Sequence, residues 1–97
     1  MTFSFHQEAE QELNDAVDYY NGCRDGLGLE FAKEVYTTIQ NILAFPLAWT
    51  PLSHNTRRCL VNRFPYGVIY QISDEQIIII AVMQLNRNPG YWKDRER

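Results

Sequence analysis

The fold of this chain is decided by residues 57–92, which read RRCLVNRFPYGVIYQISDEQIIIIAVMQLNRNPGYW. Residues 58–64 and 66–72 alternate polar and apolar side chains, a pattern typical of strands with one solvated face. Residues 77–83 are apolar without interruption and rich in β-branched side chains, which favours a strand covered on both faces. Pro65 cannot continue a central ladder, and the polar residues 73–76 suit a short turn. The segment therefore predicts three strands in an antiparallel meander.

The N-terminal half is patterned for one short strand and two helices. Residues 2–5 alternate and predict a first strand. From Gln7 an apolar stripe recurs at helical spacing and predicts a helix that ends at Asn21-Gly22. A second helix is expected over residues 29–45. Because a glycine-rich connection of a few residues joins them, the helices are expected to form a hairpin.

The remaining segments are expected to lack regular structure. Residues 46–55 contain two prolines and a tryptophan and predict a packed loop, whereas residues 93–97 are charged and predict a frayed terminus. The element order β-α-α-β-β-β predicts a single α+β domain over residues 1–97. In it, the N-terminal strand and the helical hairpin pack with a mostly antiparallel sheet, and the sheet face opposite the helices is open.

Length and composition narrow the class of protein. Ninety-seven residues are enough for one small core. The chain shows no basic-then-apolar leader and no apolar run near the roughly 20 residues that span a bilayer, so we expect a cytoplasmic protein that makes no membrane contact. Cys23 and Cys59 lack the spacing of metal ligands and are expected to be free thiols. No metal site and no cofactor is predicted.

Charge is distributed unevenly along the chain. The net charge is −3, and residues 1–55 contain two Lys or Arg against eight Asp or Glu. Residues 56–97 contain seven Lys or Arg against four Asp or Glu. The basic C-terminal half therefore permits a local anionic partner, although a ribosome-binding protein would more typically be basic overall.

The order of these motifs resembles the RelE/ParE superfamily, the small toxins of bacterial type II toxin–antitoxin pairs. The resemblance lies in R-R…R-F-P-Y-x-[VI]-x-Y-x-I, a short turn, I-x-I-I-A-V and R-x-P-G-Y-W, preceded by E-A…E-L…A-x-x-Y-Y and L-G-x-x-F. The resemblance implies the same α+β fold, β-α-α-β-β-β, that the pattern of elements predicts. It also implies a cognate antitoxin that lays an extended or helical segment over the groove between the helices and the sheet, in a hetero-oligomer.

The main candidates for binding a phosphate or a protein target are four arginines and a tryptophan: Arg57, Arg58, Arg63, Arg87 and Trp92. A guanidinium can clamp a phosphate with two hydrogen bonds. If the strands pair in sequence order, and alternation places Arg63 on the open face, the guanidiniums could converge. The alternative is a solvated sheet face whose arginines pair with Asp or Glu.

A catalytic role is implied for Arg63, Arg87 and Tyr91 only if the chain cleaves RNA. In the RNA-cleaving branch of the superfamily, arginines at the matching positions bind the phosphate, and an aromatic residue near the C-terminus stacks on a base or transfers a proton. The alternative for Tyr91 is that it covers the edge of the sheet together with Trp92.

The set needed for RNA cleavage is incomplete. Metal-free cleavage requires a base, an acid and positive charge at the phosphate, and arginine is a poor base. Gln84 stands where many relatives carry His, and residues 52–56 contain none of the lysines of the RNA-cleaving branch. His54 could act as a substitute base, although a single loop histidine is more often exposed to solvent.

The hypothesis favoured by these gaps is a ParE-like toxin that binds DNA gyrase, traps it on cleaved DNA and is not an enzyme. The first alternative is a RelE-like, ribosome-dependent and metal-independent mRNA endonuclease. The second is a repurposed binding module of the same fold without toxicity.

Overall fold

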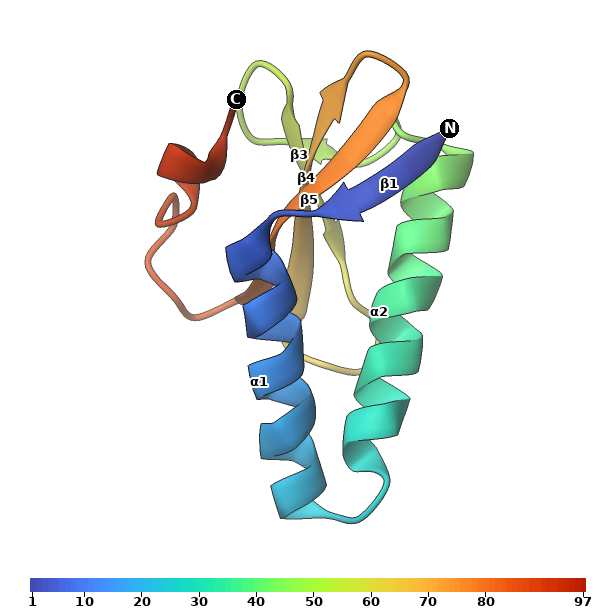
Figure 1. Cartoon of the computed structure of the whole chain (residues 1–97), viewed down its shortest axis with the longest axis vertical. Helices are drawn as coiled ribbons and strands as arrows, with labels where there is room; N and C mark the ends of the chain where they lie inside the picture. The colour runs from blue at the N-terminus through green and yellow to red at the C-terminus, as the bar shows by residue number, and fades with distance from the viewer.

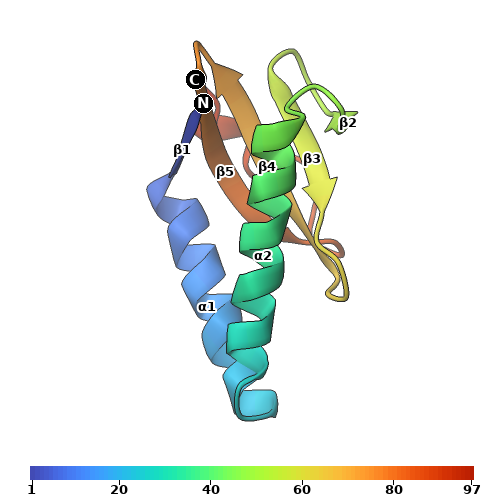
Figure 2. The same cartoon turned by 90° about the vertical axis from the view of Figure 1, so that its right-hand side faces the viewer.

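The computed structural model describes residues 1–97, and its elements form two helices and one five-stranded sheet. In chain order they are β1 (Thr2–Phe5), α1 (Gln7–Cys23), α2 (Leu27–Ala44), β2 (Thr50–Pro51), β3 (Thr56–Leu60), β4 (Tyr66–Ser73), β5 (Gln76–Gln84) and the 3₁₀ helix η1 (Lys93–Arg95). The strand order is β1-β5-β4-β3-β2, with β1 parallel to β5 and the other pairs antiparallel. The two helices run side by side (Figures 1 and 2). The predicted α+β fold and the sequential pairing of the meander are confirmed.

The strand β5 is buried on both faces, as its uninterrupted apolar sequence predicts. Toward the helices it contributes Ile77, Ile79 and Val82 to the main core, and its remaining apolar side chains join a smaller cluster on the opposite face. Ile69 pairs with Ala81 and Tyr70 pairs with Ile79, so a bulge leaves Ile80 without a partner in β4. No helix combines the length and the apolar character that crossing a bilayer requires.

The turn between the helices is tighter than the sequence predicts. Asn21 and Gly22 lie within α1, which continues to Cys23, and α2 already begins at Leu27. The prediction that Asn21-Gly22 ends the helix is wrong because the Asn21 side chain has another partner. Its Oδ1 accepts a hydrogen bond from the Gly28 N–H at 2.8 Å and so caps the first turn of α2. Gly26, at φ 84°, makes the turn.

Gly28 permits close contact between the helices, so Gly28→Ala is expected to destabilise the fold. A Cβ at this position would lie 2.4 Å from the backbone oxygen of Val17 and 2.6 Å from Cγ of Asn21. The helices would have to separate, at a cost of about 2 kcal/mol. Gly22→Ala is the matched control, because nothing lies within 4 Å of its Cβ position. The control should stabilise α1 by up to about 1 kcal/mol. Equal urea midpoints for the two variants would contradict this prediction.

Two boundaries around the meander differ from the prediction. The segment 46–55 contains the two-residue strand β2, which pairs with Arg57 and Arg58 and is too short to leave a periodic pattern. The strand predicted over 58–64 instead covers Thr56–Leu60. It ends early because the chain turns before Pro65, with Arg63 in the left-handed region at φ 71°.

The C-terminal strap, residues 91–97, is anchored, so the prediction of a frayed terminus is wrong. The Glu96 carboxylate accepts hydrogen bonds from the hydroxyls of Thr56 and Ser53. The Gln71 side-chain amide exchanges two hydrogen bonds with the backbone of Arg97, at 3.0 and 3.1 Å. These polar contacts fix the end of the chain to β3 and β4.

The strap also covers part of the sheet face that the sequence predicts to be open. Figure 1 shows it, in red, on the side of the sheet away from α2. Trp92 is only 4% exposed and packs in the smaller cluster with Ile69, Ile78, Ile80, Ala81 and Met83. The fold therefore has a second small core beneath the strap.

Candidate functional site

Glu12 of α1 is the centre of a polar network that joins α1, β5 and the strap. Its carboxylate accepts hydrogen bonds from the backbone N–H of Val82 at 3.0 Å and the hydroxyl of Tyr91 at 2.7 Å. The Arg95 guanidinium donates to both carboxylate oxygens, at 3.0 and 3.2 Å, and to the Ile80 carbonyl at 3.0 Å. The Glu12 and Arg95 side chains are only 15% and 11% exposed. This pair is an internal part of the fold.

The network lies where one edge of β5 has no neighbouring strand. Pairing with β1 ends at Ile79, whose carbonyl accepts the N–H of His6. Ile80 is the unpaired residue of the bulge, and Val82 lies beyond the end of β1. Buried backbone groups at such an edge need partners, and the Glu12 and Arg95 side chains supply them. The end of β1 thus explains why a charged pair is buried here.

Arg87 and Tyr91 are stacked at the border of this network. The Arg87 guanidinium carbon lies 3.7 Å from the centroid of the Tyr91 ring, a cation–π contact, and Nη1 lies 3.4 Å from a Glu12 oxygen. Burial, followed by the hydrogen bond to Glu12 and the charge of that carboxylate, raises the pKa of the Tyr91 hydroxyl well above its ordinary value. The phenol is therefore neutral and already donates its proton to a carboxylate.

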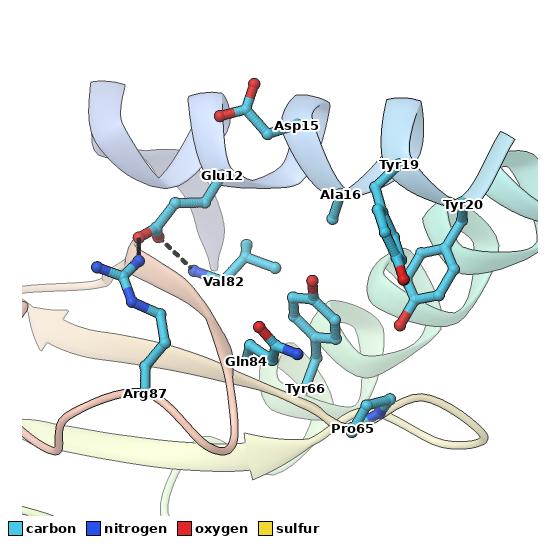
Figure 3. A pocket seen from close by; sticks show the side chains of 10 residues that line it. All are labelled: Glu12, Asp15, Ala16, Tyr19, Tyr20, Pro65, Tyr66, Val82, Gln84 and Arg87. Carbon is cyan, nitrogen blue, oxygen red and sulfur yellow. Dashed lines mark hydrogen bonds and ion pairs between the residues drawn. The ribbon is translucent and has the colours of Figure 1, made fainter. Parts of the chain in front are cut away.

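A groove of about 570 Å³ lies beside the network, between α1 and the end of β5. Figure 3 shows the Glu12–Arg87 pair at one end of this α1 groove and the Tyr19 and Tyr20 rings at the other. Ten residues line it: Glu12, Asp15, Ala16, Tyr19, Tyr20, Pro65, Tyr66, Val82, Gln84 and Arg87. Burial raises the pKa of Tyr66 and of Tyr20, so their hydroxyls act as neutral donors and acceptors. The groove thus offers apolar rings and polar groups together.

Arg63 does not lie on the open face of the sheet, so that prediction is wrong. The strand β3 ends three residues earlier, at Leu60. The turn then directs the Arg63 guanidinium to α2, where it contacts Glu30 at 2.9 Å and Glu34 at 3.5 Å. Arg63 and Arg87 are therefore held by carboxylates of different helices.

Arg57 and Arg58 point to opposite faces of β3. Arg57 lies on the helix side and donates to the carbonyls of Leu47 and Trp49, at 3.1 and 2.8 Å, which fixes the chain before β2. Arg58 lies on the outer face, where its side chain passes over Gly67. The four predicted arginines do not converge, because Arg57 and Arg58 point to opposite faces of β3 and the other two pair with carboxylates of different helices. Trp92, predicted to contact a target, is buried.

Neither Arg95 nor Glu12 is among the candidate residues that the sequence predicts. One signal was available: position 12 is three residues after Ala9 and four before Ala16, and both alanines are buried. Glu12 therefore shares a helical face with the core. His54, the possible substitute base, is exposed. No group of three or more His, Cys, Asp or Glu side chains could hold a metal ion.

Comparisons with known proteins agree with this fold. Residues 3–89 match the family described as the ParE toxin of the type II toxin–antitoxin system parDE. The chain is 30% identical over 86 residues to Toxin ParE2 of Mycobacterium tuberculosis. The matched residues make up 88% of this chain and 82% of the relative. A solved structure described as the chromosomal ParDE TA system from P. aeruginosa has the same fold, with a TM-score of 0.77 at 16% identity, and the match covers 89% of this chain and 97% of that one. This protein belongs to the ParE toxin family of type II toxin–antitoxin systems.

Proposed function

We propose that this toxin acts in the cytoplasm by binding DNA gyrase and trapping it on cleaved DNA, without catalysing a reaction itself. One observation carries the choice of binding over catalysis. The groups that RNA cleavage would need already have partners in the protein, since the half-exposed Arg63 side chain pairs with carboxylates of α2 and the Tyr91 hydroxyl donates to Glu12.

The chemistry of RNA cleavage supports the same choice. A ribonuclease of this kind needs a group that accepts the 2′-hydroxyl proton near its operating pH, and positive charge at the phosphate. Tyr91 has a raised pKa, and Gln84, on the wall of the α1 groove, cannot titrate. The Arg63 charge is neutralised by Glu30 and Glu34. Binding a protein target requires none of these proton transfers.

The α1 groove is the proposed docking site for the cognate antitoxin. Its walls combine tyrosine rings with Glu12, Asp15 and Gln84, and Tyr19 at one end is 65% exposed. A partially apolar groove next to an exposed ring suits an extended or helical polypeptide segment. The neutralised toxin is then part of a hetero-oligomer with its antitoxin.

Two parallel assays on the purified protein test this proposal: supercoiling by DNA gyrase, and cleavage of mRNA on translating ribosomes. We expect supercoiling to fall and cleaved DNA to accumulate, mRNA to stay intact, and added antitoxin to restore supercoiling. Tyr91→Phe is an informative variant, because it removes only a hydroxyl and keeps the ring that Arg87 stacks on. It should inhibit gyrase as the wild type does.

Two outcomes would reject the proposal. If the wild type cleaves mRNA without affecting gyrase, and Tyr91→Phe loses that cleavage, the protein is a RelE-like endonuclease. No effect in either assay, with antitoxin binding retained, would establish a binding module without toxicity.

A further inference from the structure

A partly exposed patch on the outer face of the sheet is built around the half-buried Arg58. Arg58 and Leu60 are alternate residues of β3, and Leu60 pairs across the ladder with Gly67 of β4. A Leu85 methyl carbon lies 3.5 Å from where a Gly67 Cβ would be. We call these four residues the outer-face patch. It lies on the sheet face away from the helices.

The Arg58 guanidinium lacks the internal partners that other arginines have. Arg57 donates to two carbonyls, and Arg63, Arg87 and Arg95 each contact a carboxylate. Arg58 Nε is the one buried side-chain nitrogen or oxygen without a hydrogen-bond partner in the protein. Desolvating part of a charged group without an acceptor is costly. Nε itself is out of reach of a partner, but the two terminal nitrogens are neither engaged inside the protein nor among its buried atoms without a partner, so an external acceptor can bind them.

The aliphatic part of Arg58 is held in place by Gly67. A Cβ at Gly67 would lie 3.2 Å from both Cγ and Cδ of Arg58, so the arginine chain lies directly on the glycine backbone. A guanidinium whose stem is already fixed loses less conformational entropy when it binds a partner. The absence of a side chain at position 67 therefore prepares Arg58 for binding.

The surroundings of Arg58 fit a protein partner better than DNA. Leu60 and Leu85 are 56% and 42% exposed. A partly buried arginine beside exposed apolar side chains is typical of the energetic centre of a protein–protein interface. A surface for the DNA backbone would instead present several cations, whereas Arg58 is the one cation among the four residues of the patch. The ligand chemistry that fits is a carboxylate flanked by apolar groups.

We propose that the outer-face patch binds the target protein of the toxin, which inserts an Asp or Glu carboxylate against Arg58 between Leu60 and Leu85. The identity of that target as gyrase rests on the function proposed above. The α1 groove lies on the helix side of the sheet, so the antitoxin proposed there and the target would use different faces of the sheet.

The test compares Arg58→Gln with Arg24→Gln, which removes the same charge from an exposed arginine paired with Glu30 at 3.0 Å. Each variant is expressed without antitoxin to measure growth arrest, then purified to measure gyrase inhibition, antitoxin binding and urea unfolding. Arg58→Gln should weaken gyrase inhibition by about tenfold or more and abolish growth arrest. Its antitoxin affinity and unfolding midpoint should match those of Arg24→Gln.

Gly67→Ala is a second variant that keeps the charge. Its methyl group would displace the Arg58 stem by a few tenths of an ångström. We expect gyrase inhibition to weaken by a smaller factor than in Arg58→Gln, with antitoxin affinity unchanged.

Three results would overturn the proposal. The first is Arg58→Gln acting as strongly as Arg24→Gln. The second is a folded Arg58→Gln that loses antitoxin binding, which would assign the patch to the antitoxin. The third is a loss of binding by Arg58→Gln that appears only when DNA is present with gyrase, which would identify a DNA phosphate as the ligand. If the wild type arrests growth without affecting gyrase, the proposed target fails, yet loss of arrest in Arg58→Gln alone would still support the patch.

Discussion

Replacing Glu12 by alanine is expected to destabilise the folded protein by about 3–5 kcal/mol, because it leaves a buried guanidinium without its carboxylate. Arg95 is 11% exposed, so its charge cannot move freely into water. The backbone N–H of Val82 and the hydroxyl of Tyr91 lose their acceptor in the same substitution. Each unsatisfied buried donor adds its own desolvation cost.

Asp15→Ala is the matched control for Glu12→Ala. Asp15 lies on the same helix, also borders the α1 groove and accepts a hydrogen bond only from the exposed Gln11 side chain. We expect its removal to change the free energy of unfolding by less than about 0.5 kcal/mol. Urea denaturation of both variants measures the difference directly. If both variants lost a similar free energy of unfolding, the buried Glu12–Arg95 pair would contribute no more to stability than a surface carboxylate does.

A double-mutant cycle separates the ion pair from the backbone contacts. Arg95→Met keeps much of the buried side-chain volume but removes the charge. If the Glu12–Arg95 contact accounts for most of the effect, the double variant should lose less than the sum of the two single losses. A purely additive result would attribute the stabilisation to the hydrogen bonds with Val82 and Tyr91 instead.

The sequence predicts the elements of this fold better than their connections. The apolar run over residues 77–83 and the helical stripe from Gln7 are local patterns, so β5 and α1 follow from them directly. The β5 bulge leaves no such pattern. Whether Ile80 keeps its partner in β4 depends on pairing that only the assembled sheet determines.

The candidate site was less predictable, because its residues meet only in the folded chain. Glu12 and Arg95 are 83 positions apart, and each lies in a segment that looks solvent-exposed by composition. The position of Arg63 depends on a left-handed turn rather than on strand alternation. Arg58 was among the candidates, but the feature that distinguishes it, the buried Nε without an acceptor, is a property of packing.

Replacing Trp92 by alanine is the second substitution with a large expected effect. The side chain is 4% exposed and covers the smaller cluster on the outer face of the sheet. Deleting a buried tryptophan side chain costs about 3–5 kcal/mol, and partial collapse of the strap onto the sheet would reduce that loss. Lys93→Ala, at an exposed position of the same strap, should leave stability nearly unchanged.

Hydrogen exchange shows whether Trp92 holds the strap or contacts a target. If it holds the strap, Trp92→Ala should speed exchange at the amide of Arg97, which donates to Gln71, while the amides of α2 keep most of their relative protection. Loss of the indole would expose Ile78 and Ile80 of β5 and should make the variant prone to aggregation. A variant that stays as stable as Lys93→Ala but no longer inhibits the target would instead make Trp92 a recognition residue. That outcome would require the strap to open when the toxin binds, because the indole is buried in the free protein.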